Sequence, residues 1–331
     1  MVEVVETAVP RPAPGQLLVK THLSAISPGT EMLIWRGQFP QDVAVDETIE
    51  ALAGGFSYPL VYGYACVGEV TALGDGVDAS WLGRRVFAFN PHQSYFAARP
   101  EQVVVLPDEL PWETAVMLPN METAVSFLMD ARPQIGEQAA LFGQGVVGLL
   151  TTMLLAQMPM ASLVAVDSYP LRRTWAQKMG ATAVVDAAHP DAISHIRAAL
   201  QQNRAFAGAD LTFELSGNPA ALDMAIAVTG YSGRVLVGSW YGRKPATLHL
   251  GGQFHRSHMR LISSQVSHIA PQWQGRWSKR RRLDVALTML QHHRPDKLIT
   301  HRLPVTQAAD AYALLDNAPE TAVQLVLTYH P

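Results

Sequence analysis

The 331-residue sequence predicts an α/β protein that combines a doubly wound parallel sheet with a second domain rich in β-strands. Short apolar runs separated by Gly and Pro occupy roughly the first 120 residues. Beyond them, strands alternate with helices in a pattern typical of a parallel sheet. Hydrophobic residues make up 48% of the chain, which is enough to bury a large core and excludes a mainly disordered protein.

The N-terminal stretch is predicted to fold as an antiparallel sheet or a partial barrel. Its clearest expected strands cover residues 17–21, 61–73, 83–89 and 103–107. Helical periodicity is confined to a segment near residues 111–124. This first region is therefore expected to consist almost entirely of strands and turns.

The pattern changes near residue 122, where strands begin to alternate with helices. The expected strands cover residues 139–142, 163–166, 183–186, 210–215 and 234–238, and the expected helices 149–156, 171–179 and 193–201. From about residue 266 onward, the sequence predicts an amphipathic helix around 283–290, a short helix near 308–315 and a strand at 322–327. Crossovers of this length predict a parallel, doubly wound sheet in the middle of the chain.

Composition excludes several classes of function. The formal net charge is −3, so the chain lacks the basic field of a dedicated nucleic-acid-binding protein. The single cysteine, Cys66, excludes an intramolecular disulfide and any metal site made of several cysteines. The acidic N-terminus does not resemble a signal peptide, and no apolar run reaches the roughly 20 residues that a membrane span needs. We therefore expect a cytoplasmic protein with a small-molecule substrate and no membrane or nucleic-acid partner.

A glycine motif follows the strand at 139–142. Gly143, Gly145 and Gly148 match the pattern GxGxxG between a strand and a helix. The first glycine allows a tight turn, the second lets a pyrophosphate approach the backbone, and the third lets the helix pack closely on the strand. The helix N-terminus, which includes Val146 and Val147, offers unpaired N–H groups to the anion. The motif predicts dinucleotide binding, with a structural glycine turn in another α/β fold as the alternative.

Asp167 ends the next strand, 19 residues after Gly148, where a dinucleotide site carries its acidic residue. A carboxylate there accepts hydrogen bonds from the ribose hydroxyls of NAD and repels the 2′-phosphate of NADP. Ser168 follows it and is included in the predicted cofactor site. Arg172 and Arg173 complicate the choice, because either can pair with a phosphate, lie against the ribose, or be a solvated helix residue. NAD is the expected cofactor, with NADP as the alternative.

With this order of domains, the chain resembles the medium-chain dehydrogenase/reductase superfamily over essentially its whole length. Three segments look most like the bacteriochlorophyllide a dehydrogenase branch of that superfamily: Ile26–Gly37 (ISPGTEMLIWRG), Tyr58–Tyr64 (YPLVYGY) and Leu298–Arg302 (LITHR). The resemblance implies a GroES-like catalytic domain over 1–121 and 266–331 and a Rossmann domain over 122–265. It also implies a homodimer, and an oxidoreductase that binds its substrate between the two domains.

The resemblance adds to the predicted cofactor site. Thr123, expected at the start of a helix, matches a position that contacts nicotinamide in relatives, with a plain helix-turn hydroxyl as the alternative. Ser216, Gly238 and Ser239 lie at or after two strand ends and complete the predicted contacts.

The chain departs from the zinc-dependent members of the family at every expected ligand. Pro28 occupies the place of the cysteine in their Cys-x-Thr/Ser-Asp motif, and Gly63-Tyr64-Ala65 replaces their Gly-His-Glu. The third ligand region, near 119–123, has no Cys or His in place. We therefore predict an enzyme without zinc. An unexpected metal site made of Glu31, His92 and Glu122 is the alternative.

Without zinc, other groups must polarise the substrate. Thr30 keeps the family's hydroxyl position, and Tyr64 is expected to point into the same cleft, where a phenol can donate to an oxygen that gains charge. Tyr64 as an aromatic space-filler and Glu31 as a purely structural residue are the alternatives. The prediction is a zinc-independent, NAD(P)-dependent oxidoreductase that acts on a carbonyl/alcohol pair or a conjugated enone. A catalytically silent dinucleotide sensor or scaffold protein is the alternative function.

Two weaker features have open interpretations. The basic run Lys279–Arg282 is either a solvated face or a contact for an anionic substrate or partner. Trp240, Tyr241, Trp273 and Trp277 either line an apolar substrate pocket or pack in the core.

Overall fold

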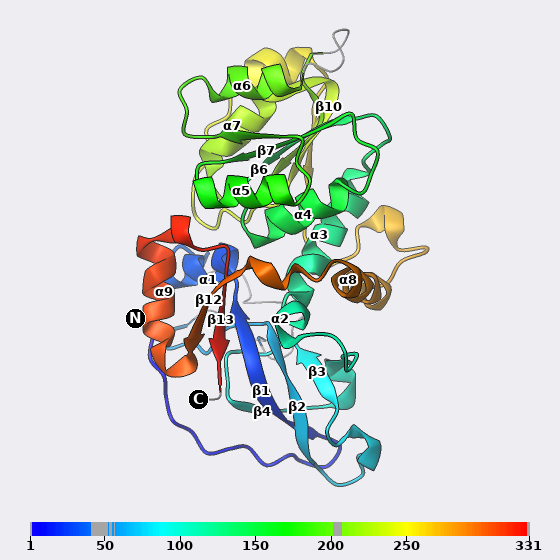
Figure 1. The fold of residues 1–331 in the computed structure, drawn as a ribbon, viewed down its shortest axis with the longest axis vertical. Helices are drawn as coiled ribbons and strands as arrows, with labels where there is room; N and C mark the ends of the chain where they lie inside the picture. The colour runs from blue at the N-terminus through cyan, green and yellow to red at the C-terminus, as the bar shows by residue number, and fades with distance from the viewer. Residues whose placement is uncertain (1, 41–51, 53–54, 56, 201–206, 330–331) are drawn as a thin grey trace. The chain divides into compact units, whose positions relative to one another are not determined.

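The computed structural model describes residues 2–40, 52, 55, 57–200 and 207–329, and the chain divides into two compact units (Figure 1). Unit 1 consists of Met1–Pro119 and Leu287–Pro331, and unit 2 of Asn120–Ala286. The first boundary lies close to the predicted one, whereas the second lies later than residue 265. The reason is that residues 266–286 are tied to α3 (Leu118–Ala131) by polar contacts of Trp273 and Arg282.

Unit 1 is built on a seven-stranded sheet in the order β12-β13-β1-β2-β3-β5, with β4 paired to β1. The strands are β1 (Leu17–Ile26), β2 (Cys66–Leu73), β3 (Arg85–Ala88), β4 (Tyr95–Ala98), β5 (Val103–Val105), β12 (Ile299–Pro304) and β13 (Gln324–Thr328). All pairs are antiparallel except β12 with β13, which confirms the predicted antiparallel architecture apart from that pair. Neither β4 nor β12 was among the predicted strands.

The helices that lie wholly in unit 1 include α1 (Pro28–Trp35), α2 (Trp112–Ala115) and α9 (Ala308–Asn317). The helix α1 begins with Pro28 after the N-cap Ser27, and the fixed φ of proline suits the first helical position. It packs against α9 through a shared apolar core that includes Met32, Ala311 and Leu315 (Figure 1). This packing places the first turn of α1 beside the C-terminal part of unit 1.

Unit 2 contains a six-stranded parallel sheet in the order β11-β10-β9-β6-β7-β8. The strands are β6 (Gln138–Phe142), β7 (Ser162–Asp167), β8 (Ala183–Asp186), β9 (Ala209–Glu214), β10 (Thr229–Val237) and β11 (Arg260–Ser263). The chain order reverses between β6 and β9, so the predicted doubly wound parallel sheet is confirmed. Ligands of such sheets bind at the carboxyl ends of the strands beside this reversal.

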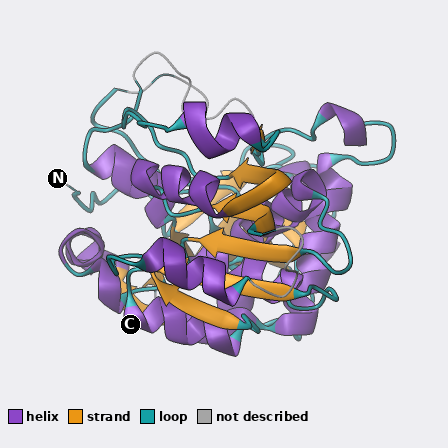
Figure 2. Ribbon diagram, turned by 90° about the horizontal axis from the view of Figure 1, so that it is seen from above, coloured by secondary structure: helices purple, strands orange, loops and turns teal. Residues whose placement is uncertain are grey.

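Helices cover both faces of the unit 2 sheet, and Figure 2 shows its strands flanked by helices. They include α4 (Val146–Leu155), α5 (Pro170–Lys178), α6 (Ala192–Ala199) and α7 (Pro219–Val228). Alternate residues of β6 serve two cores: Ala140 and Phe142 pack in one, whereas Ala139 and Leu141 pack in the other. The period of two along each buried strand is what makes a two-faced sheet.

The remaining long helix, α8 (Lys279–His293), covers the predicted amphipathic segment. Within the described part of the chain, no helix is both long enough and apolar enough to cross a bilayer.

Candidate functional site

The glycine loop between β6 and α4 has the geometry that its motif predicts. Gly143 has φ +90°, and a Cβ there would lie 2.5 Å from the backbone of Ser216. A Cβ on Gly148 would lie 2.0 Å from the carbonyl oxygen of Gly143. At Gly145, the N-cap of α4, a Cβ would have no atom within 4 Å. The first and third glycines are therefore required by packing, while the second faces open space at a helix N-terminus, which fits a pyrophosphate.

Gln144, at a variable position of the motif, fixes the loop from inside. Its buried side chain accepts from Thr152 Oγ1 at 2.9 Å and donates to the carbonyl of Leu141 at 3.3 Å. These contacts hold the loop in shape before any ligand binds, and sequence reasoning did not single the residue out.

Asp167 closes β7 and is 7% exposed. One carboxylate oxygen accepts from the backbone N–H of Gln144 at 2.7 Å, and the other from the N–H of Tyr169 at 2.8 Å. A carboxylate offers about four lone-pair positions, so acceptor capacity remains for ribose hydroxyls. Asp167 thus ties the glycine loop to the next strand and keeps the chemistry expected of a ribose contact.

The two arginines after Asp167 have different surroundings. Arg173 donates to the carbonyl of Asp167 at 2.8 Å and pairs with Asp186 at 3.2 Å, so it is bound to two strand ends rather than solvated. The guanidinium of Arg172 lies 4.7 Å from the ring centroid of Tyr169, a cation–π distance. Ser168 is exposed at the end of β7.

A polar cluster lies at the carboxyl ends of β9 and β10. Buried Glu214 accepts from the N–H of Ser216 at 2.8 Å, and also from the hydroxyls of Ser216 and Tyr241. Ser239 Oγ accepts from the N–H of Gly217 at 2.8 Å and donates to the carbonyl of Glu214 at 3.3 Å. Burial and the nearby Glu214 charge raise the pKa of Tyr241, so this phenol stays a donor. Sequence reasoning missed Glu214, the centre of the cluster.

Gly238 is also placed at this edge, where a Cβ would lie 2.3 Å from Phe127 Cζ and 2.7 Å from Leu215 Cδ2. Packing inside unit 2 therefore accounts for glycine here. Ser216 lies beside Gly143, and the backbone N–H groups of Gly238 and Ser239 both donate to the carbonyl of Glu214.

Thr123 lies inside α3 rather than at the start of a helix, and it is partly exposed.

Its neighbour Glu122 forms an ion pair with Arg282 at 2.9 Å, with side chains only 8% and 1% exposed. Arg282 also donates to Ser126 Oγ and to the carbonyl of His268, both at 3.3 Å. Burial raises the pKa of Glu122, against the opposing effect of the Arg282 charge.

The basic run Lys279–Arg282 is therefore not solvated throughout, because Arg282 is buried. Arg280 in the same run is exposed and pairs with Asp284 at 2.9 Å. Two of the aromatic residues have polar partners within unit 2. The Tyr241 hydroxyl donates to Glu214, and the Trp273 indole N–H donates to the carbonyl of Met129 at 3.1 Å.

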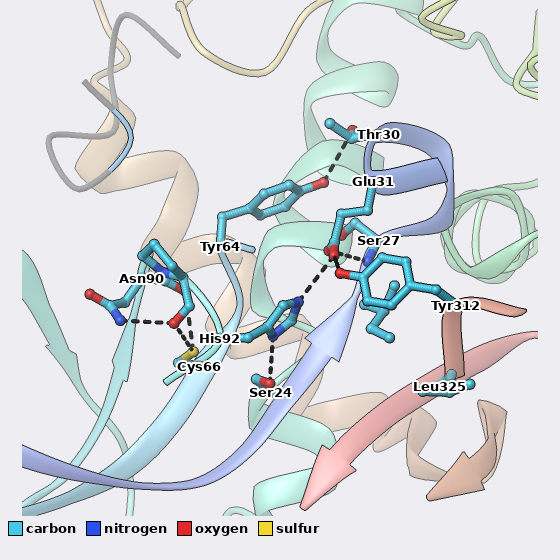
Figure 3. Close-up of polar contacts among 12 residues, drawn as sticks. Ser24, Ser27, Thr30, Glu31, Tyr64, Cys66, Asn90, His92, Tyr312 and Leu325 are labelled. Atoms are coloured by element: carbon cyan, nitrogen blue, oxygen red, sulfur yellow. Dashed lines mark hydrogen bonds and ion pairs between the residues drawn. The ribbon is translucent and has the colours of Figure 1, made fainter. Parts of the chain in front are cut away.

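In unit 1, the structure brings together the two hydroxyls that the sequence proposes for catalysis (Figure 3). Thr30 lies in the first turn of α1, and Tyr64 lies on the segment that enters β2. Tyr64 Oη donates to Thr30 Oγ1 at 3.4 Å, and both residues are partly exposed. This bond is long compared with the usual O–H···O distance, so the phenol can exchange it for another acceptor.

Glu31 points away from this pair into a buried cluster and is 2% exposed (Figure 3). One carboxylate oxygen accepts from the N–H of Ser27 at 2.7 Å. The other accepts from His92 Nε2 at 3.0 Å and from the hydroxyl of Tyr312. Burial first, and then the Glu31 charge, raise the pKa of Tyr312. These contacts are typical of a structural residue, which is the alternative role considered for Glu31.

The cluster continues beyond His92. His92 Nδ1 lies 2.6 Å from Ser24 Oγ, which lies 2.7 Å from the hydroxyl of Tyr329. The residues of this cluster come from β1, α1, the loop before β4, α9 and the position after β13. No local sequence pattern therefore predicts the cluster.

The donors near Tyr64 do not fit a catalytic zinc. Cys66 donates its thiol hydrogen to the carbonyl of Asn90 at 3.2 Å, and burial raises the pKa of this thiol, which opposes the thiolate that zinc needs. Both ring nitrogens of His92 are already hydrogen-bonded. Throughout the residues that the structure describes, no group of three or more His, Cys, Asp and Glu is arranged to hold a metal ion. The alternative site of Glu31, His92 and Glu122 is reduced to a Glu31–His92 pair, because Glu122 binds Arg282.

Comparisons with known proteins match both parts of the chain. The alcohol dehydrogenase GroES-like domain family matches residues 13–105, and the zinc-binding dehydrogenase family matches residues 146–279. Sorbitol dehydrogenase of Bacillus subtilis is 26% identical over 54% of this chain and 58% of its own length. (R,R)-butanediol dehydrogenase of the same organism is 28% identical over 58% of this chain and 61% of its own length. The chain thus aligns with about three fifths of each of these two relatives.

The fold is shared with solved structures of dehydrogenases. One, described as a short chain alcohol dehydrogenase from E. coli CFT073 complexed with NADH, superposes with a TM-score of 0.78 at 18% identity. The superposition covers 99% of this chain and 96% of that one.

Proposed function

The chain belongs to the medium-chain dehydrogenase/reductase superfamily, and from this premise we propose that it is a zinc-independent, NAD(P)-dependent oxidoreductase. The proposed reaction moves hydride between nicotinamide and a carbonyl/alcohol pair or a conjugated enone. The glycine loop carries the proposal, because Gly145 leaves open the face on which a pyrophosphate would lie while its neighbours are fixed by packing.

Unit 2 would hold the cofactor. The N–H groups at the start of α4, including those of Val146 and Val147, would bind the pyrophosphate, and Asp167 would accept from the ribose. Thr123, Ser216 and Ser239 are the further contacts that we propose. When bound, the cofactor supplies the hydride chemistry, and the protein supplies orientation and electrostatics. The carboxylate of Asp167 favours NAD, while Arg172 is the feature that supports NADP.

Unit 1 would supply the hydrogen-bond donor. Tyr64 can turn its hydroxyl from Thr30 to a substrate oxygen and stabilise the charge that develops there during hydride transfer. Thr30 would then stay within reach as a second hydroxyl. The chemistry of the nearby donors supports zinc independence, since the one nearby thiol is buried and held protonated and His92 is committed to other bonds.

We further propose a homodimer formed through the nucleotide domain, as the superfamily resemblance implies. Strand β11 is the end strand of the unit 2 sheet and three of its four residues are exposed, and an end strand is where another chain could pair. Light scattering on the purified chain tests this, and a monomer at micromolar concentration would contradict it.

The experiment for the function combines binding with turnover. Calorimetric titration with NADH and NADPH is followed by a spectrophotometric screen of ketones, enones and quinones, with zinc content measured on the same sample. We expect saturable binding, tighter for NADH, turnover of at least one acceptor, and well under one zinc per chain. Tight binding without turnover would favour the sensor alternative, and stoichiometric zinc lost together with activity would overturn zinc independence.

A further inference from the structure

His92 lies between the two segments that carry the Thr30–Tyr64 pair. On one side its Nε2 contacts Glu31, which follows Thr30 in α1, at 3.0 Å. On the other side its ring packs against Gly63, which precedes Tyr64: a Cβ on Gly63 would lie 2.7 Å from His92 Cδ2 and Nε2. One imidazole therefore touches the residue after Thr30 and the residue before Tyr64, and Figure 3 shows it beside Glu31.

The backbone strengthens this arrangement. The N–H of His92 donates to the carbonyl of Tyr62 at 3.0 Å, so the loop that carries His92 is bonded to the segment before Tyr64. Gly63 has φ +116°, a conformation that L side chains rarely adopt. Glycine at this position allows both the turn and the close approach of the ring.

The pair is buried and its carboxylate is fully engaged. The side chains of His92 and Glu31 are 9% and 1% exposed. Ser27 and Tyr312 donate to the same carboxylate, so it has three donors from α1, α9 and the His92 loop. A buried acceptor with this many donors has little freedom to move, because each lost bond would leave a desolvated polar group.

His92 is hydrogen-bonded at both ring nitrogens. A carboxylate has no hydrogen to give, so His92 Nε2 carries one and donates to Glu31. Burial raises the pKa of Tyr329, so its phenol stays protonated. Ser24 Oγ lies 2.6 Å from His92 Nδ1 and 2.7 Å from the Tyr329 hydroxyl, so a second set of hydrogen bonds holds the ring at the nitrogen away from Glu31.

We propose that His92 is a positioning residue that holds Thr30 and Tyr64 together by cross-linking α1 to the segment before β2. The proposal rests on the proposed function, in which Tyr64 donates to the substrate. In this chain, hydrogen bonds and ring packing through His92 join the same two segments.

The test uses a readout of Tyr64 that needs no substrate. Tyrosine rings labelled with ¹³C are followed by NMR, and the Tyr64 signal is assigned by its loss in Tyr64→Phe. His92→Leu removes both ring bonds, whereas His92→Gln keeps an N–H donor for Glu31. Tyr58→Phe is the matched control, since Tyr58 is a largely exposed residue whose hydroxyl also bonds to α1, at the carbonyl of Ile34.

We expect the Tyr64 signal to shift or broaden in His92→Leu, to stay close to the parent in His92→Gln, and to be unmoved in Tyr58→Phe. An unchanged Tyr64 signal in folded His92→Leu would overturn the proposal. If His92→Leu does not fold, Tyr312→Phe decides by the same signal, because it deletes one donor to Glu31 and keeps the ring against Trp35.

Kinetics separate this proposal from the proposed function. On any substrate that the parent turns over, His92→Leu should lower kcat by about tenfold or more with NADH affinity within twofold, and His92→Gln should recover most of the loss. An equal loss of kcat in His92→Leu and His92→Gln would contradict positioning. If the Tyr64 signal shifts in His92→Leu but the parent turns over no substrate, the cross-link is supported and the enzymatic function is contradicted.

Discussion

The cofactor loop of unit 2 is shaped mainly by backbone, whereas the hydroxyl pair of unit 1 is supported by buried side chains. Around Gly143 and Gly148 the close contacts are with main-chain atoms. Around Thr30 and Tyr64 the support comes from Glu31 and His92 and from the tyrosines behind them. A site shaped by backbone should be disrupted by a Cβ at a closely packed glycine. A site supported by buried side chains should be disrupted by the loss of one polar atom.

The largest effect should come from the backbone-shaped loop. In Gly148→Ala, the new Cβ would overlap the carbonyl of Gly143, so we expect a loss of unfolding free energy of about 3 kcal/mol. Gly145→Ala is the matched control, because its Cβ meets open space and only the N-cap preference for glycine is lost, so its stability should fall by about 1 kcal/mol or less. Urea unfolding measures both.

The same control sharpens the function. Gly145→Ala should weaken NADH binding by about tenfold or more in calorimetry, since its Cβ would occupy the pyrophosphate face. Equal stability losses in the two alanine variants, or unchanged NADH affinity in Gly145→Ala, would contradict this account of the loop.

The next effect concerns the hydroxyl pair. Tyr64→Phe keeps the ring and removes the donor, so kcat should fall on the order of 10²-fold with little change in cofactor affinity. Steady-state kinetics on an accepted carbonyl or enone would check this. Activity within a few-fold of the parent would instead identify Tyr64 as a space-filler.

A smaller effect should follow from the buried support of that pair. Glu31→Gln keeps the shape of the side chain but replaces one carboxylate oxygen with an NH₂ group. That group would face the N–H or O–H donors that now bond to Glu31, so we expect a loss of unfolding free energy of about 2 kcal/mol. Thermal unfolding of the variant, with Glu69→Gln on the partly exposed face of β2 as a control, measures this. A loss no larger than that of the control would show that Glu31 is dispensable for the fold.

The smallest effect should be a change of cofactor preference. Asp167→Ser, with Arg172 retained, should weaken NADH binding by about tenfold, which is about 1.4 kcal/mol, and move the preference toward NADPH. Titration of both cofactors into the parent and the variant measures the ratio. Tighter NADPH than NADH binding by the parent would mean that an arginine dominates over Asp167.

The same difference between the two regions decides what the sequence can predict. Gly143, Gly145, Gly148 and Asp167 lie within 25 consecutive residues, and their spacing between strand and helix is a local signal. The Glu31 cluster joins residues separated by 61 and 281 positions, and no periodicity encodes such contacts. Thr30 and Tyr64 were found only because a family motif marks both segments.

The fold shows the same limit. The buried strands β6, β7 and β9 were predicted from their apolar runs, whereas short β4 and the alanine-rich helix α7 were not, because neither has a clear period. The buried position of Arg282 was likewise not predicted, because it stands in a run of charges that resembles a solvated face. Its ion pair with Glu122 depends on the tertiary structure.

Titration of NADH into the purified, chelator-treated chain tests the central claim most directly. The account predicts saturable binding of one NADH per chain without added metal, and about tenfold or greater weakening in Gly145→Ala. No binding, or binding that appears only after zinc is restored, would contradict it.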